Sequence, residues 1–250
     1  HDALPICLFN WLENRFWTLP LKTPLAQNKF ESASKHFYRH KTMERLRMAF
    51  EKTGIQDQKR VVNGVETPLI NEMLASIEWD RFVQKGIPGP FHGDLQFDNI
   101  LLTEKQNEPF ILIDWRQDFS GLDYGDRYYD LAKLNGGFSL NYAQIKAGQK
   151  LNLIESEDKK KITITDFMNN ELQKSKEAFD RFCVEKNYDL NRIELITALI
   201  YLNMAPLHTA PFDRFLIYYG QSRLAQALKN APVSARSEER RVGKACRSRW

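Results

Sequence analysis

Cysteine is scarce in this 250-residue sequence, and long hydrophobic runs are missing. The three cysteines are Cys7, Cys183 and Cys246, an odd and scattered set without the paired spacing of a zinc site. They argue against disulfide bonds and zinc and favour a reducing compartment, so we expect a cytoplasmic protein. No apolar run reaches the roughly 18 residues that a membrane span requires. We therefore expect no membrane span.

Net charge is also lacking outside the C-terminal end. The formal net charge is +4, and residues 232–250 hold six basic residues against two glutamates, which accounts for all of it. The basic residues are Arg236, Arg240, Arg241, Lys244, Arg247 and Arg249. The neutral remainder gives no electrostatic reason to expect nucleic acid or an anionic membrane as a partner.

The two ends differ from the rest of the chain in their pattern. Residues 232–250 lack periodicity and are similar to translated adapter sequence, with a native basic extension as the alternative. Residues 1–6 look similar in origin to residues 232–250. We expect one domain, residues 7–231, flanked by non-native or disordered ends. With 42% hydrophobic residues, the chain can bury a substantial core.

Apolar residues between these ends recur mostly at helical spacing. Helices are expected near 7–19, within 24–52, over 69–83 and 128–134, over 167–184 and 189–202, and from 211 to 228. The segment 189–202 is apolar nearly all round and should be the central helix. Gly136 and Gly137 should end the helix before them. Short hairpins are expected around Asn63-Gly64 and within 151–165. The fold class is α+β, mostly α.

A basic cluster lies within the second helical segment. It consists of Arg39, His40, Lys41, Arg45 and Arg47. We interpret it as a solvated helix face, with a phosphate-facing role as the alternative.

The most informative stretch lies in the middle of the chain. Two short apolar runs, 99–102 and 110–113, flank polar turn residues and predict a β-hairpin. Asp94 and Asn99 stand at the entry to the first strand, and Asp114 directly follows the second. A hairpin returns the end of its second strand beside the start of its first. The three side chains should therefore converge and offer oxygen ligands to a hard cation.

The spacing of these residues is specific. The chain reads His92-x-Asp94, then Asn99, then a strand that ends in Asp114. This stretch resembles the catalytic loop and metal-binding strand of the aminoglycoside phosphotransferase and choline kinase family, relatives of the protein kinases. Their motif is H-x-D-x-x-x-x-N, followed by an I-D strand and later by G-D-x-x-x-D-L-A. The last segment is present from Gly125 to Ala132.

The resemblance implies the C-terminal lobe of a protein-kinase-like fold, with the hairpin carrying the catalytic and metal-binding residues. It makes Asp94 the catalytic base and Asn99 and Asp114 the residues that hold Mg²⁺ and, through it, the nucleotide. His92 would brace the loop, and Asp126 would support the loop by tying it to the next helix or serve as an ordinary helix cap. The implied function is transfer of the γ-phosphoryl group of ATP to a hydroxyl of a small molecule, such as a sugar, an amino alcohol or an aminoglycoside-like compound.

Two features depart from the family pattern. Trp115 and Arg116 follow Asp114, where protein kinases carry Phe and Gly. Upstream of Asp94 there is no strand-borne glycine-rich loop of the kind that holds a nucleotide. The residues there have mostly helical patterns, and the family places the helix 69–83 beneath the catalytic loop. We therefore expect a fragment whose N-terminal nucleotide lobe is largely absent and which is inactive alone.

Two other functions stay open. A non-catalytic kinase-like module would bind a partner or a small molecule, although all three motif side chains are intact. A metal-dependent phosphohydrolase would need several clustered histidines, and the chain has no His-x-His pair. The acceptor is open as well, because both acidic and aromatic residues lie near Asp114 and suit a cationic substrate or a quaternary ammonium. The sequence does not indicate the oligomeric state.

Overall fold

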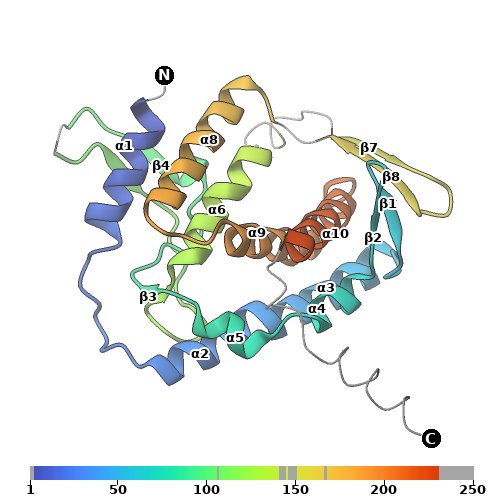
Figure 1. Ribbon diagram of the computed structural model, residues 1–250, viewed down its shortest axis with the longest axis horizontal. Coiled ribbons are helices and arrows are strands. Elements are labelled where there is room, and N and C mark those ends of the chain that lie inside the picture. The colour runs from blue at the N-terminus through green and yellow to red at the C-terminus, as the bar shows by residue number, and fades with distance from the viewer. Residues whose placement is uncertain (1–2, 106, 141–144, 146–150, 166–167, 231–250) are drawn as a thin grey trace, which may run out of the picture.

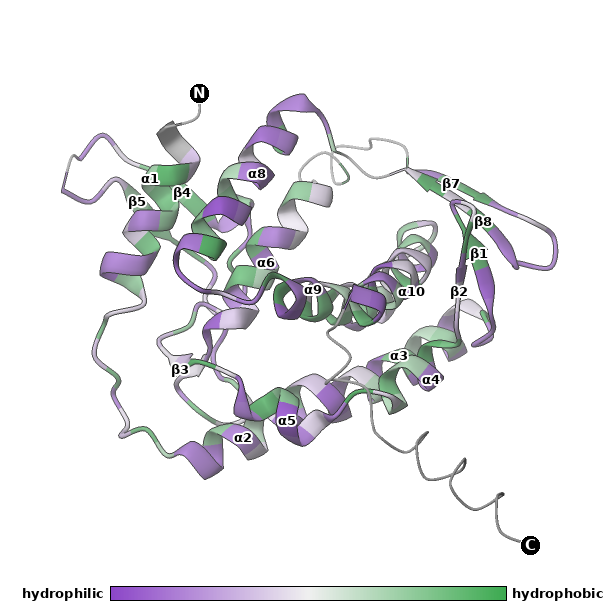
Figure 2. Ribbon diagram, viewed as in Figure 1, coloured by the Kyte–Doolittle hydropathy of each residue, from purple (hydrophilic) through white to green (hydrophobic). Residues whose placement is uncertain are grey.

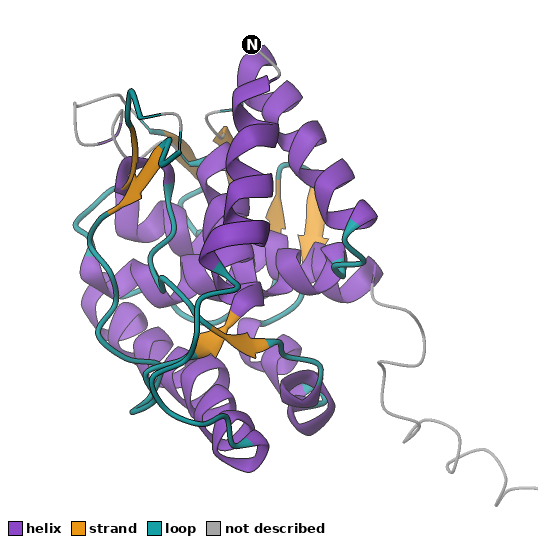
Figure 3. Ribbon diagram, turned by 90° about the vertical axis from the view of Figure 1, so that its left-hand side faces the viewer, coloured by secondary structure: helices purple, strands orange, loops and turns teal. Residues whose placement is uncertain are grey.

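The computed structural model describes residues 3–105, 107–140, 145, 151–165 and 168–230. The architecture is α+β and mostly helical, as expected, with one small mixed sheet and two short strand pairs (Figure 1). Figure 3 shows how short the strands are beside the helices. Residues 3–6, expected with the non-native end, belong to the first helix, and the expected tail 232–250 lies outside the described residues. None of the described helices is long and apolar enough to cross a bilayer.

Helices dominate the N-terminal part of the chain. They are α1 (Ala3–Trp11) with the π-helical turn η1 (Leu12–Phe16), α2 (Gln27–Lys35), the π-helical turn η2 (His36–His40) and α3 (Lys41–Thr53). The last three form one continuous helical run, which ends where Gly54 takes a left-handed conformation with φ 66°. These elements confirm the helices expected within 7–19 and 24–52.

The single helix expected over residues 69–83 is wrong. The structure has two short helices instead, α4 (Ile70–Ala75) and α5 (Trp79–Gln84). Side chains occupy the backbone carbonyls at the break: the Ser76 hydroxyl donates to the Met73 carbonyl at 2.7 Å, and the Trp79 indole donates to the Leu74 carbonyl at 3.1 Å. Such side-chain bonds compete with the helical ladder. No single long helix therefore spans residues 69–83, where the family resemblance implied one beneath the loop that carries Asp94.

Both expected surface hairpins are confirmed, but they belong to one sheet. β1 (Arg60–Val62) and β2 (Val65–Thr67) form the first, and β7 (Asn152–Glu155) and β8 (Lys161–Thr165) form the second. β1 and β8 pair in parallel, which gives the strand order β2-β1-β8-β7. The Asn63 side chain joins them, because its amide donates to the Ile164 carbonyl and accepts from the Ile164 N–H, both at 2.8 Å.

The C-terminal helices form the core around α9. These helices are α6 (Arg127–Ser139), α8 (Asn170–Glu185), α9 (Leu190–Met204), the 3-10 turn η4 (Ala205–Leu207) and α10 (Phe212–Asn230). α9 packs against α6, α10 and α3, and it is apolar along most of its length (Figure 2). The prediction of a central helix is confirmed.

Gly136 and Gly137 do not end α6, contrary to the expectation. Both lie inside the helix, and a neighbouring aromatic ring approaches each one closely. A Cβ on Gly137 would lie 2.9 Å from the ring of Phe97, and one on Gly136 would lie 3.3 Å from the hydroxyl of Tyr201. These glycines therefore permit close packing rather than a helix stop.

The hairpin that organises the site is confirmed. Residues 97–99 form the 3-10 turn η3 (Phe97–Asn99), and β4 (Ile100–Leu102) pairs antiparallel with β5 (Phe110–Leu112). The Ile113 N–H donates to the Asn99 carbonyl at 3.0 Å, so the end of the second strand lies beside the start of the first. A smaller pair, β3 (Pro88–Gly89) with β6 (Gly125–Asp126), connects the segment before the loop to the start of α6.

Candidate active site

Asp130 on α6 fixes the loop that carries Asp94. We call residues 91–99 the Asp94 loop. The fully buried carboxylate of Asp130 accepts the backbone N–H groups of His92 and Gly93, each at 2.8 Å. The Trp17 indole donates to the same carboxylate at 3.3 Å. Burial raises the pKa of Asp130 to about 6, against the lowering effect of these donors. Asp130 is the second aspartate of the G-D-x-x-x-D-L-A segment, and no role was expected for it from the sequence.

Asp126, expected to support the loop, bonds elsewhere. Its Oδ1 accepts from the N–H groups of Tyr128 at 3.1 Å and Ile87 at 3.0 Å, so it caps α6 and holds the segment that leads to β3. Its Oδ2 accepts from the Tyr38 hydroxyl at 3.1 Å and from Arg192 at 2.9 Å. None of these bonds reaches residues 91–99. The direct tie to the loop is therefore made by Asp130, one helical turn further on.

Arg116, which stands where protein kinases carry Gly, braces the loop from the other side. Its backbone N–H donates to the His92 carbonyl at 2.9 Å, and its side-chain Nε donates to the Gly93 carbonyl at 3.2 Å. Gly93 has φ 77°, and a Cβ there would lie 2.5 Å from the Cβ of Arg116. The close approach of the two segments therefore requires glycine at this position.

His92 lies inside the loop and away from solvent. Its ring packs against Trp115 with centroids 4.9 Å apart, and its Nδ1 accepts the Asp94 N–H at 3.2 Å. Burial lowers the pKa of His92, although the Ile113 carbonyl and the nearby carboxylates oppose this effect. A neutral ring is consistent with Nδ1 as an acceptor. This geometry supports a bracing role for His92.

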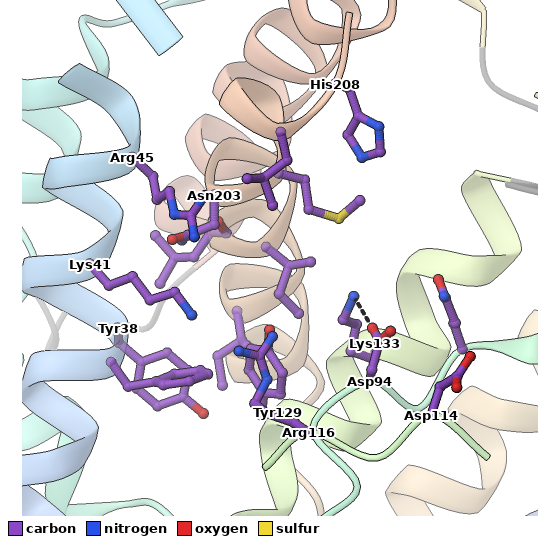
Figure 4. Close-up of a pocket in the computed structure, with 17 residues that line it drawn as sticks. Tyr38, Lys41, Arg45, Asp94, Asp114, Arg116, Tyr129, Lys133, Asn203 and His208 are labelled. Carbon is purple, nitrogen blue, oxygen red and sulfur yellow. Dashed lines mark hydrogen bonds and ion pairs between the residues drawn. The ribbon is translucent and has the colours of Figure 1, made fainter. Parts of the chain in front are cut away.

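The structure brings the three motif side chains together. Asp94 and Asp114 line one cavity of about 470 Å³ (Figure 4), which is within the size range of small-molecule sites. The Nδ2 of Asn99 donates to the Asp94 carbonyl at 2.8 Å and to the Asp94 carboxylate at 3.2 Å. Asn99 itself is buried behind Asp94 and is not part of the cavity lining. Asp114 has φ 56°, a left-handed conformation that is uncommon for residues other than glycine and often marks functional positions.

Lys133 on α6 is a site residue that sequence reasoning missed. Its Nζ lies 2.6 Å from Oδ1 of Asp94, and its side chain is 10% exposed. With Asn99 on Oδ2, both oxygens of the Asp94 carboxylate are held in place. The spacing was the available signal, because Lys133 lies three residues after Asp130 and so shares its helix face.

The oxygen atoms of the site fit a magnesium ion whose coordination is completed by substrate and water. Mg²⁺ usually keeps several waters and takes one or two protein carboxylates together with substrate phosphates. The carboxylate of Asp114 faces the cavity, and the hydrogen bonds of Asn99 use Nδ2 and leave its Oδ1 available. Within the described residues, no group of three His, Cys, Asp or Glu side chains could hold a metal by itself. A cage made by the protein alone is therefore not present in that part of the chain.

The opposite wall of the cavity is basic and apolar. Lys41 and Arg45 from α3 line it, together with apolar residues of α9, namely Ile196, Leu199 and Ile200, and Arg116 lies between this wall and Asp94 (Figure 4). The basic cluster was interpreted as a solvated helix face, and this is wrong for Lys41 and Arg45. Burial, and then the charges of Arg116 and Arg45, lower the pKa of Lys41 to about 8.

Comparisons of the chain with protein-family models, with curated proteins and with solved structures find no match. The resemblance to the phosphotransferases therefore stays a hypothesis, supported by the motif residues and by the arrangement of their side chains.

Proposed function

We propose that the chain carries the catalytic loop of an ATP- and Mg²⁺-dependent phosphotransferase that acts on a hydroxyl group of a small molecule. The supporting observation is that Asp94 and Asp114 line one cavity while Asn99 holds the Asp94 carboxylate. A proton acceptor and cation ligands within one site are what phosphoryl transfer requires.

In this proposal Asp94 accepts the proton of the attacking hydroxyl. A carboxylate oxygen has room for two hydrogen bonds, so an oxygen that already bonds Lys133 or Asn99 can still accept one from the acceptor. The two fixed contacts set the direction of the carboxylate before the acceptor binds, and the side chain of Asp94 is 32% exposed. The acceptor hydroxyl must then lie about 2.6–3.2 Å from Asp94, directly or through one water.

Asp114 and Asn99 would hold the cation through a carboxylate oxygen and the amide Oδ1. A magnesium ion bound there would neutralise negative charge on the transferred phosphoryl group. The left-handed backbone at Asp114 directs its side chain from the end of β5 into the cavity. The two side chains flank the open end of one hairpin, where the end of β5 lies beside the start of β4, so the pairing of these strands sets the spacing of the cation ligands.

A screen of ATP consumption tests this function. The chain, with any coding sequence that precedes it in the same reading frame, is assayed against sugars, aminoglycosides, choline and ethanolamine, with and without Mg²⁺. We expect Mg²⁺-dependent turnover of at least one hydroxyl compound and a loss of about 10²–10⁴-fold in Asp94→Asn, the usual contribution of a general base. The matched control is Asp98→Asn, an exposed carboxylate in the same loop. Equal turnover in wild type and Asp94→Asn would rule out the assigned base.

A non-catalytic binding module is the second candidate. The ion pair of 2.6 Å between Lys133 and Asp94 favours it, because the proposed base is already neutralised by a partner. This candidate predicts that a small molecule binds in the cavity with equal affinity in wild type and Asp94→Asn and that no variant consumes ATP. Calorimetry beside the ATP assay separates the two functions.

A further inference from the structure

We infer that the acceptor is an anionic hydroxyl compound, such as a sugar phosphate or a sugar acid, whose phosphate or carboxylate group binds Lys41, Arg45 and Arg116. The identity of this compound as an acceptor rests on the proposed function. The anion site itself rests on the geometry of the cavity wall.

Lys41 and Arg45 are the first part of this site. They lie four residues apart on α3, so they share a helix face, and both line the cavity (Figure 4). Within the described part of the chain neither has a carboxylate partner in an ion pair. Arg47 on the same helix differs, because it is exposed and pairs with Glu51 at 2.6 Å. Lys41 and Arg45 are thus the residues of α3 whose charges are available to a ligand in the cavity.

Arg116 completes the cluster from the segment after β5. Its Nε donates to the Gly93 carbonyl, and its guanidinium lies over the rings of Phe37 at 5.4 Å and Tyr129 at 5.8 Å. These contacts orient the planar group without using its two terminal nitrogens. A held guanidinium fork is well suited to bidentate binding of a phosphate or a carboxylate.

The positive charge of the cavity is unfavourable for the cationic acceptors, such as aminoglycosides and choline, that the sequence left open. Its described lining has four cationic side chains, from Lys41, Arg45, Arg116 and Lys133, against the carboxylates of Asp94 and Asp114. The aromatic rings do not form an open box for a quaternary ammonium either. Lys41 already covers Phe37 at 4.5 Å, and Arg116 covers Tyr129. An aminoglycoside or choline would add positive charge to a wall that already has an excess of it.

The crowding of these cations supports the same conclusion. Burial and the neighbouring arginines lower the pKa of Lys41 to about 8, so holding its charge in the cavity is unfavourable. An anion bound between Lys41 and its neighbours would offset this repulsion. Lys41 and Arg45 lie across the cavity from Asp94 and Lys133, and Arg116 lies between the two sides (Figure 4). One ligand can therefore place its anionic group at one side and a hydroxyl at the other.

Isothermal titration calorimetry without ATP tests the anion site. The probes are inorganic phosphate, glucose 6-phosphate, glucuronate and glucose, and the variants are Lys41→Gln and Arg45→Gln. We expect glucose 6-phosphate, glucuronate or both to bind at least tenfold more tightly than glucose. Each variant should weaken phosphate and anionic sugar binding by about tenfold, the loss of one charge-assisted contact. Arg47→Gln, the same change on the exposed face of α3, should leave affinity unchanged. Comparison of glucose 6-phosphate with glucuronate shows whether the site prefers a phosphate or a carboxylate group.

Several results would overturn the inference. These are absence of phosphate binding, equal affinity for glucose and both anionic sugars, or an equal effect of Arg47→Gln. Competitive displacement of the anionic sugar by ADP would assign the cations to the nucleotide instead and would also overturn it. Failure of the proposed function gives a different result: anions bind as expected, but no anionic hydroxyl compound is phosphorylated. Conversely, turnover of neutral or cationic hydroxyl compounds without preference for anions keeps the function and removes this inference.

Discussion

Asp130 and Lys133 show how single side chains of α6 position the candidate base. Asp130 holds the loop backbone at His92 and Gly93, and Lys133 holds the carboxylate of Asp94. The motif spacing was sufficient to predict that Asp94 and Asp114 share one cavity and that Asn99 lies beside Asp94, because a hairpin is a local structure. It was not sufficient to predict the two α6 contacts, since these depend on how a helix docks under the loop.

We predict that Asp130→Asn loosens the Asp94 loop locally. Asparagine has one acceptor oxygen, so one of the two N–H groups that Asp130 binds loses its partner, at a cost of about 1–3 kcal/mol. Amide hydrogen exchange at Gly93 or His92 should therefore become roughly tenfold faster or more at pH 7. The melting temperature should change less, because the substitution also removes a buried charge whose pKa is raised to about 6. Unchanged exchange at both amides would contradict the role given to Asp130.

Lys41 should make the affinity of the site for anions depend on pH. Burial is the main cause that lowers its pKa to about 8, and the charges of Arg116, Arg45 and Lys133 lower it further, with Asp118 opposing them. Lys41 is cationic below pH 8 and becomes neutral above it, so affinity for glucuronate should fall as the pH rises from 7 to 9.5. Glucuronate stays ionised throughout this range, and Lys41→Gln should remove the step. A flat profile in the wild-type protein would contradict the assignment.

Among the helices and strands, the hairpins that depend on residues close in sequence were predicted correctly, whereas the break between α4 and α5 and the pairing of distant strands were not. The turn at Asn63-Gly64 and the β4–β5 hairpin follow from residues close in sequence. The parallel pairing of β1 with β8 joins residues about one hundred positions apart, and no local pattern encodes it. The helix stop expected at Gly136 and Gly137 was wrong for a related reason. Aromatic rings from distant segments pack against these two glycines within α6.

Gly93 and Gly121 provide a matched test of how the loop is built. Both have positive φ, 77° and 87°, but a Cβ on Gly121 would meet open space while one on Gly93 would meet Arg116 at 2.5 Å. Substitution by alanine should lower the free energy of unfolding by about 1–2 kcal/mol at both positions, because alanine is unfavourable in the left-handed conformation. We predict that Gly93→Ala costs a further 1–3 kcal/mol, roughly the cost of overpacking. Urea unfolding measures both, and equal losses would show that the two segments are not in close contact.

At the scale of the whole molecule, Asp126 joins several elements through one buried carboxylate. It caps α6, holds the segment before β3 through Ile87, and bonds Tyr38 and Arg192 from two other helices. The side chain of Asp126 is fully buried and that of Arg192 is 4% exposed. The sequence indicated the cap but not the ion pair, because Arg192 is 66 residues away.

We predict that Asp126→Ala destabilises the whole fold by about 3–5 kcal/mol, the usual cost of leaving one partner of a buried ion pair alone. The control is Asp80→Ala. Asp80 pairs with Lys35 at 2.6 Å, but its side chain is 81% exposed, so the loss should stay below about 1 kcal/mol. Denaturant unfolding gives both values. Similar losses for the two variants would contradict the central position of Asp126.

Cation binding at the β4–β5 hairpin shows most directly whether Asp94, Asn99 and Asp114 form a magnesium site. Mn²⁺ serves as a paramagnetic probe for the proposed magnesium site, and electron paramagnetic resonance measures its affinity for the chain in the presence of ADP. We predict that bound Mn²⁺ broadens the NMR signals of Asp94, Asn99 and Asp114, and that Asp114→Asn weakens binding about tenfold. Asp118→Asn, a nearby exposed carboxylate, should bind Mn²⁺ as wild type does. Equal Mn²⁺ affinity in wild type and Asp114→Asn, or broadening that is strongest in another part of the chain, would contradict the proposed magnesium site.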